Sequence, residues 1–116
     1  MFVAYAVVTV VTLLANAGTA VADVAGARSV LANSAEVGVP RAWLPVLAGL
    51  KAAGALGLLL GLLGLPVVGE AAASGLVVFF IGAMGAHVRA RVFHNIAFPA
   101  GYLALAVASL ALAAAY

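Results

Sequence analysis

Four long runs of apolar residues divide the chain, and short polar segments separate them. The runs cover residues 2–22, 43–63, 68–88 and 96–115. Each is close to the roughly 20 residues that a helix needs to cross a bilayer core of about 30 Å. The runs lack the alternation of barrel strands, and open strands cannot span lipid. The pattern therefore predicts an all-α, integral membrane four-helix bundle that forms a single domain over residues 1–116.

The links between the runs differ in length and in charge. The turn between the second and third runs is short and contains Pro66, whereas the link between the first two runs is about twenty residues long. Within that first link, residues 28–37 place Val30, Leu31 and Val37 at helical spacing. We expect a short helix there, lying at the membrane interface.

Composition excludes most soluble classes of protein. Hydrophobic residues make up 68% of the 116 residues and charged residues only 7%, and the mean hydropathy is +1.33. A small soluble domain cannot hide that much apolar surface. The absence of cysteine from the sequence excludes disulfide scaffolds, cysteine-type zinc sites and thiol redox chemistry.

The few charged residues are better interpreted as signals of membrane orientation than as a surface that binds a polyanion. Five Lys and Arg against three Asp and Glu are too few for a basic patch, so we expect no nucleic acid partner. Four arginines lie in the first and third links and none in the second: Arg28, Arg41, Arg89 and Arg91. By the positive-inside rule these links are cytoplasmic, both termini are external, and the protein is a multi-pass protein of the plasma membrane.

Lys51 is the most informative single residue. It lies about nine positions into the second run, which is roughly 13 Å along a helix, where a charge costs roughly 2.5–3.5 kcal/mol. Asn16 is placed at a similar depth in the first run, and Asp23 or Glu36 could pair with the amine if the first link dips inward. Two interpretations stay open: a ligand or proton site on Lys51, or a lysine that snorkels to the headgroups.

Glycines recur on one face of two of the runs. Gly54, Gly57 and Gly61 share a face of the second run, and Gly75 and Gly82 share a face of the third. Such small residues let helix backbones approach closely in lipid. We interpret these glycines as helix-packing positions, with Lys51 beside the crossing.

The third run ends in His87, Arg89 and Arg91. The arginines could hold an anionic headgroup, whereas no carboxylate or cysteine accompanies His87 at metal-ligand spacing. We predict no catalytic and no metal site. The candidate ligand-binding residues are Asn16, Lys51, His87, Arg89 and Arg91.

Two stretches resemble a known family. They are the residues from Val39 to Leu62, with Trp43, Lys51 and the glycines, and those from Gly75 to Arg91. Together they are similar to the DoxX-like family of small four-helix membrane proteins, and the Ala, Val and Gly content resembles actinobacterial-type members. The resemblance implies the fold, and founding members resemble membrane subunits of a thiosulfate:quinone oxidoreductase. Lys51, His87 and Arg89 match positions where the family's motifs carry polar residues.

These observations leave three functions open. The first is an accessory or ligand-binding membrane subunit without catalysis of its own, with quinone or lipid as the ligand. The second is a small transporter of an anionic or amphipathic solute, since Lys51 would favour negative charge. The third is a purely structural or assembly subunit. The expected partners are membrane lipid and either a larger membrane protein complex or further copies of the chain.

Overall fold

The computed structural model describes residues 2–115, which are almost entirely helical. The elements are α1 (Phe2–Ala25), α2 (Arg28–Glu36), the short 3₁₀ helix η1 (Arg41–Trp43), α3 (Leu44–Leu62), α4 (Pro66–Ala90) and α5 (Ala97–Ala115). Four of these helices, α1, α3, α4 and α5, are long and apolar enough to cross a membrane. The predicted fold class, an all-α membrane protein, is confirmed.

The ends of the helices follow from local chemistry. Helix α1 continues past the expected end at residue 22 to Ala25, where Gly26 takes a left-handed φ of 67°. Helix α4 starts at Pro66, before the expected start at residue 68; proline suits the first turn because it has no N–H to leave unpaired. The extension of α1 matters for function, because it brings Asp23 into the helix.

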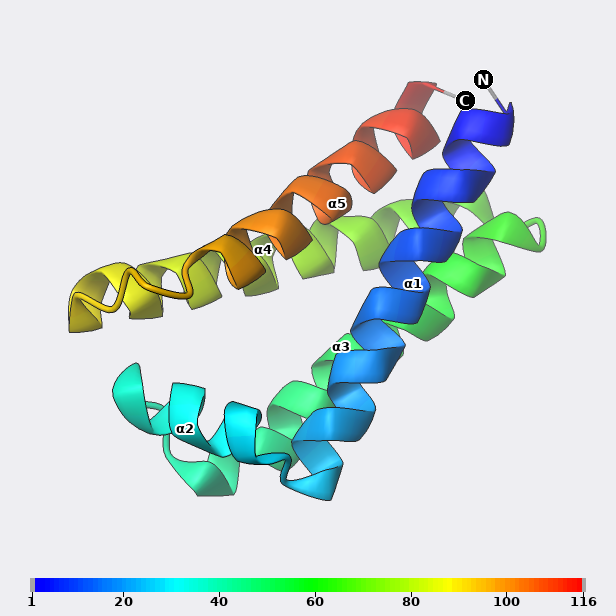
Figure 1. Cartoon of the computed structure of the whole chain (residues 1–116). Coiled ribbons are helices and arrows are strands. Elements are labelled where there is room, and N and C mark those ends of the chain that lie inside the picture. The colour runs from blue at the N-terminus through cyan, green and yellow to red at the C-terminus, as the bar shows by residue number, and fades with distance from the viewer. Residues whose placement is uncertain (1, 116) are drawn as a thin grey trace.

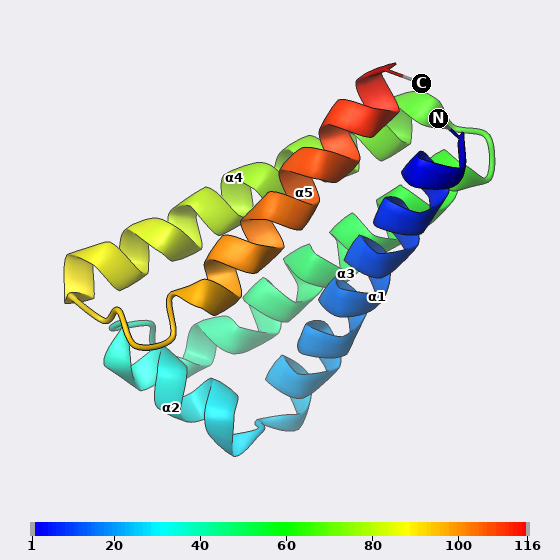
Figure 2. The same cartoon turned by 45° about the horizontal axis from the view of Figure 1, so that its top comes forward.

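The four long helices form a closed ring that is splayed at one end. Helix α1 packs against α3 and α5, and α4 packs against the same two helices. Figures 1 and 2 show the pair α1–α3 and the pair α4–α5 converging where the two termini lie and diverging at the other end. We call the end with the termini and the α3–α4 turn the closed end. We call the end with α2 and the α4–α5 link the open end.

Glycines account for the close approach of α3 to α4. A Cβ built on Gly61 would lie 2.6 Å from the Cα of Gly69, and one built on Gly57 would lie 2.5 Å from the Cβ of Ala72. Such contacts would force the backbones apart. At Gly75 and Gly82 an added Cβ would meet nothing within 4 Å. The close approach expected of these two glycines is therefore absent, because both are exposed on α4.

The buried face of α1 is polar, whereas the outer faces of the long helices are apolar. Thr9, Thr12, Asn16 and Asp23 are all buried along α1, and the Thr12 hydroxyl lies 2.8 Å from the hydroxyl of Ser109 on α5. Large apolar side chains such as Val3 and Val67 are more than 70% exposed. Polar side chains inside and apolar side chains outside are the arrangement that a lipid environment favours.

Candidate functional site

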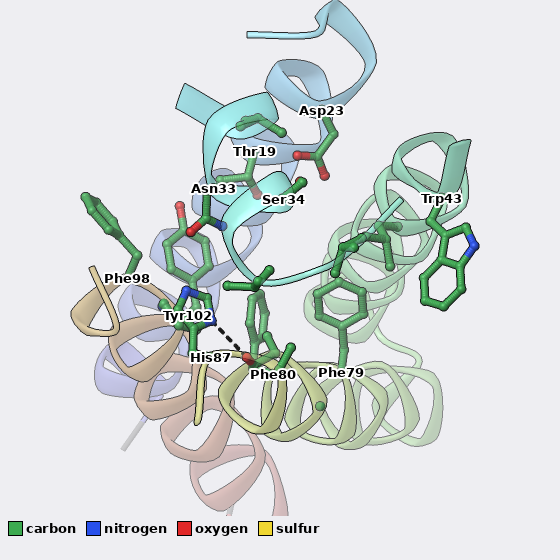
Figure 3. Close-up of a pocket in the computed structure, with 18 of the residues that line it drawn as sticks. Thr19, Asp23, Asn33, Ser34, Trp43, Phe79, Phe80, His87, Phe98 and Tyr102 are labelled. Atoms are coloured by element: carbon green, nitrogen blue, oxygen red, sulfur yellow. Dashed lines mark hydrogen bonds between the residues drawn. The ribbon is translucent and has the colours of Figure 1, made fainter. Parts of the chain in front are cut away.

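A cavity of about 860 Å³ lies between the splayed helices at the open end. Residues of all five α-helices and of the α4–α5 link line it, and α2 lies across it (Figure 3). Most of the lining is apolar. The polar lining residues that bear on its chemistry are Asp23, Asn33, Lys51, His87, Arg89 and Asn95.

Lys51 forms an ion pair inside the bundle. Its Nζ lies 2.8 Å from Oδ2 of Asp23, and the two side chains are only 14% and 4% exposed. The amine also lies 5.7 Å from the centroid of the Phe79 ring, a distance that allows a cation–π interaction. The lysine therefore does not snorkel to the headgroups, and its charge is offset by a buried carboxylate. Further N–H groups of the ammonium are available beyond the one that Asp23 accepts.

His87 lies on the cavity wall with one nitrogen bonded and the other unpaired. Its Nδ1 lies 2.9 Å from the carbonyl oxygen of Ala83 in the same helix, as the dashed line in Figure 3 shows. The residue is 4% exposed, and its Nε2 is buried without a hydrogen-bond partner. A buried polar atom without a partner costs about 1–3 kcal/mol. The imidazole therefore has an unused site of interaction.

Aromatic side chains form a continuous wall of the cavity. The Phe79 and Phe80 rings lie 5.0 Å apart, and the Phe80 and Tyr102 rings lie 5.3 Å apart. Trp43 and Phe98, which also line the cavity, are exposed and lie on opposite sides of it in Figure 3. The sequence does not reveal this wall, because its members come from α4 and α5 and share no regular spacing along the chain.

The family comparison matches most of the chain. The model of the DoxX-like family covers residues 7–109. The chain belongs to the DoxX-like family. With its four apolar helices it is a multi-pass membrane protein. Comparisons with curated proteins and with solved structures find no match to the chain.

The structure of this DoxX-like protein brings together only some of the residues predicted to bind a ligand. Lys51, His87 and Arg89 line the cavity, whereas Asn16 and Arg91 do not. Asn16 is fully buried and donates from Nδ2 to the carbonyl oxygen of Thr12, so its expected meeting with Lys51 does not occur. Arg91 ends α4 in a left-handed conformation with its side chain exposed.

Helix α2 of the DoxX-like protein is fastened to the link between α4 and α5. Asn95 donates from Nδ2 to Oδ1 of Asn33 over 2.6 Å, at a partly buried position. His94 and Glu36 form an exposed pair with 2.6 Å between Nε2 and Oε2. A helix forms where residues 28–37 predicted one, ending at Glu36, and these contacts fasten it to the link beside the cavity. Among residues 2–115, no group of three or more His, Asp or Glu could hold a metal ion.

Proposed function

We propose that this DoxX-like protein holds a membrane-soluble amphipathic molecule, a quinone or a lipid, between its splayed helices. It acts as an accessory subunit in the plasma membrane and has no catalysis of its own. One observation carries the proposal: an apolar cavity within a membrane bundle has a buried imidazole on its wall with an unpaired nitrogen. Pockets for small ligands typically combine apolar walls with a few polar groups in this way.

The dimensions and chemistry of the cavity fit such a ligand. About 860 Å³ lies within the range of roughly 300–1,000 Å³ that is usual for ligand pockets. The Phe80 and Tyr102 rings offer flat surfaces for a quinone ring or an acyl chain. The remaining N–H groups of Lys51 can donate to a ligand carbonyl, since Asp23 accepts only one of them.

The exposed aromatic residues at the cavity's edges favour access from the bilayer. Trp43 is 57% exposed and Phe98 is 70% exposed, and both line the cavity. In a membrane these side chains contact lipid, so an apolar molecule can pass them without crossing water. A polar metabolite would meet an unfavourable apolar surface on the same route.

The single tryptophan of the chain, Trp43, provides a direct test. Quinones quench indole fluorescence at short range, so binding of decylubiquinone to the protein in lipid nanodiscs should quench Trp43 in a saturable manner. Quinone that is only dissolved in the bilayer quenches linearly with concentration. If the natural ligand is a lipid, native mass spectrometry of the same samples should detect that lipid bound to the protein in a fixed ratio.

A matched pair of variants localises the binding. Ala86 lines the cavity, and Ala86→Phe fills it, whereas Ala104→Phe adds the same bulk to an exposed position on α5. We expect Ala86→Phe to abolish saturable quenching and any lipid adduct, and Ala104→Phe to retain both. The proposal is wrong if wild-type protein shows neither saturable quenching nor an adduct, or if both variants bind alike.

A further inference from the structure

We infer that the ligand of the cavity presents a hydroxyl group to Nε2 of His87, so the site selects a hydroxyl-bearing amphipath over the same molecule without the O–H. This inference deepens the proposed function and rests on it.

The hydrogen bond within α4 determines which ring nitrogen of His87 carries the proton. The carbonyl oxygen of Ala83 can only accept, and it lies 2.9 Å from Nδ1, so Nδ1 is the donor. In the neutral imidazole the other nitrogen then has a lone pair and no hydrogen. Nε2 of His87 is therefore an acceptor.

Among the described residues, no carboxylate on the cavity wall is free to accept a hydrogen bond from Nε2 of His87, which is buried without a partner. The carboxylate on the cavity wall, Asp23, is already paired with Lys51. A ligand that satisfies Nε2 must therefore bring a donor hydrogen, which a quinone carbonyl or an ether oxygen does not have.

A second buried acceptor lies on the same cavity wall. Oδ1 of Asn95 has no hydrogen-bond partner, while the Nδ2 of the same amide is occupied by Asn33. His87 and Asn95 come from the end of α4 and from the link that follows it, so both belong to the open end. Two unpaired acceptors and an aromatic wall fit a ring or headgroup that carries hydroxyl groups.

The charge of the cavity distinguishes a hydroxyl from an ammonium donor. Among the side chains that the structure describes, the charged ones that line it are Lys51, Arg89 and Asp23, two cations against one anion. Because Lys51 and Asp23 pair with each other, the positive charge of the exposed Arg89 is left unbalanced at the cavity and disfavours a cationic ligand. The donor is therefore a neutral hydroxyl, as in a quinol or in the free hydroxyl of a diacylglycerol.

Nitrogen NMR of the imidazole tests the inference directly. The chain has two histidines, and His94→Gln leaves His87 as the one ring to observe, because His94 lies outside the cavity lining. In ¹⁵N-histidine-labelled protein we expect an unprotonated Nε2. Its resonance should shift when decylubiquinol is added, and should not shift with the dimethyl ether of the same quinol. The same comparison between diacylglycerol and its acetylated form tests whether the ligand is a lipid. A shift with diacylglycerol alone would identify a lipid hydroxyl as the donor.

Binding measured by titration gives a second readout. We expect decylubiquinol to bind about tenfold more tightly than its dimethyl ether, which corresponds to about 1.4 kcal/mol, and His87→Leu to remove that difference. A protonated Nε2 in the free protein, or equal affinity for the quinol, the quinone and the ether, would overturn the inference while leaving the proposed function intact. Failure of every quinone and lipid probe to bind would instead reject the proposed function.

Discussion

The pair between Lys51 and Asp23 is the residue-scale feature on which both the fold and the cavity depend. Two opposite charges in a membrane bundle cost desolvation energy, and their mutual attraction returns most of it when the geometry is good. With 2.8 Å between Nζ and Oδ2 and both side chains mostly buried, neither charge is left alone. The pair also joins α1 to α3 beside the cavity, so it positions the amine on the cavity wall.

Removing one partner of this pair should destabilise the protein more than removing both. Lys51→Met leaves the Asp23 carboxylate buried without a cation, and we expect a loss of about 3–5 kcal/mol in the free energy of unfolding. The double variant Lys51→Met with Asp23→Leu should recover much of that loss. Unfolding in a mixed-detergent titration measures all three proteins. A double variant as unstable as the sum of the singles would show that the two side chains do not interact.

At the same scale, the sequence identified Lys51 but not its partner. The need for a counter-charge followed from one lysine in an apolar run, whereas the choice among Asn16, Asp23 and Glu36 depended on how far α1 extends. Helix α1 ends at Ala25, so Asp23 lies on its buried face. A signal was present: Thr9, Thr12, Asn16 and Asp23 recur at helical spacing, and polar residues of a membrane helix face the bundle interior.

At the scale of elements, glycines allow a close contact between α3 and α4. A methyl group on Gly61 would lie 2.6 Å from the backbone of Gly69, whereas one on Gly75 would meet nothing within 4 Å. We expect Gly61→Ala to destabilise the protein by about 1–3 kcal/mol through overpacking. Gly75→Ala, the matched control, should be neutral or stabilising by up to about 1 kcal/mol, because alanine is the better helix former. Thermal unfolding in detergent compares them, and equal effects would contradict the assigned contact.

The two polar contacts that the structure describes between α2 and the α4–α5 link differ in burial. The Asn33–Asn95 bond is partly buried, while the His94–Glu36 pair is exposed, with side chains 65% and 43% accessible. Exposed ion pairs contribute about 0–1 kcal/mol. We therefore expect Asn95→Ala to accelerate hydrogen exchange of the α2 amides several-fold and His94→Gln to change it little. Exchange in α1 serves as the internal reference. The opposite order of effects would show that the exposed pair holds α2 in place.

The elements themselves were predictable, and their packing was only partly so. Apolar runs of membrane length predicted the four long helices, and helical spacing in residues 28–37 predicted α2. The sequence does not reveal which glycines make contacts, because Gly75 and Gly82 have the spacing of a packing face, yet both are exposed on α4 and Gly82 lines the cavity. Spacing identifies a face of a helix, but the partner of that face is determined by the tertiary arrangement.

At the scale of the whole molecule, the splay of the helix pairs separates two roles along the bundle. Glycine contacts hold α3 and α4 together toward the closed end, while aromatic residues line the cavity between the pairs at the open end. The cavity was not predictable from the sequence, because it forms between residues of every long helix and α2. The volume of the cavity depends on the angles between the helices, and no local sequence pattern determines those angles.

The distribution of arginine over the two ends predicts the orientation of the molecule. Arg28, Arg89 and Arg91 are exposed at the open end, and no Lys or Arg lies in the α3–α4 turn at the closed end. Short links rich in arginine stay in the cytoplasm, so the cavity and α2 should lie on the cytoplasmic side, with the termini outside.

Introduced cysteines can test this orientation without interference, since the chain has none of its own. Leu65 in the α3–α4 turn is 51% exposed and Phe93 in the α4–α5 link is 56% exposed. In intact spheroplasts, a membrane-impermeant maleimide should label the Leu65→Cys variant and should reach the Phe93→Cys variant only after permeabilisation. The reverse labelling would place the arginines outside, and the ligand site would then open toward the external half of the membrane. Replacing Arg89 and Arg91 with Gln should weaken the preference, because these two charges contribute half of the arginine bias between the links.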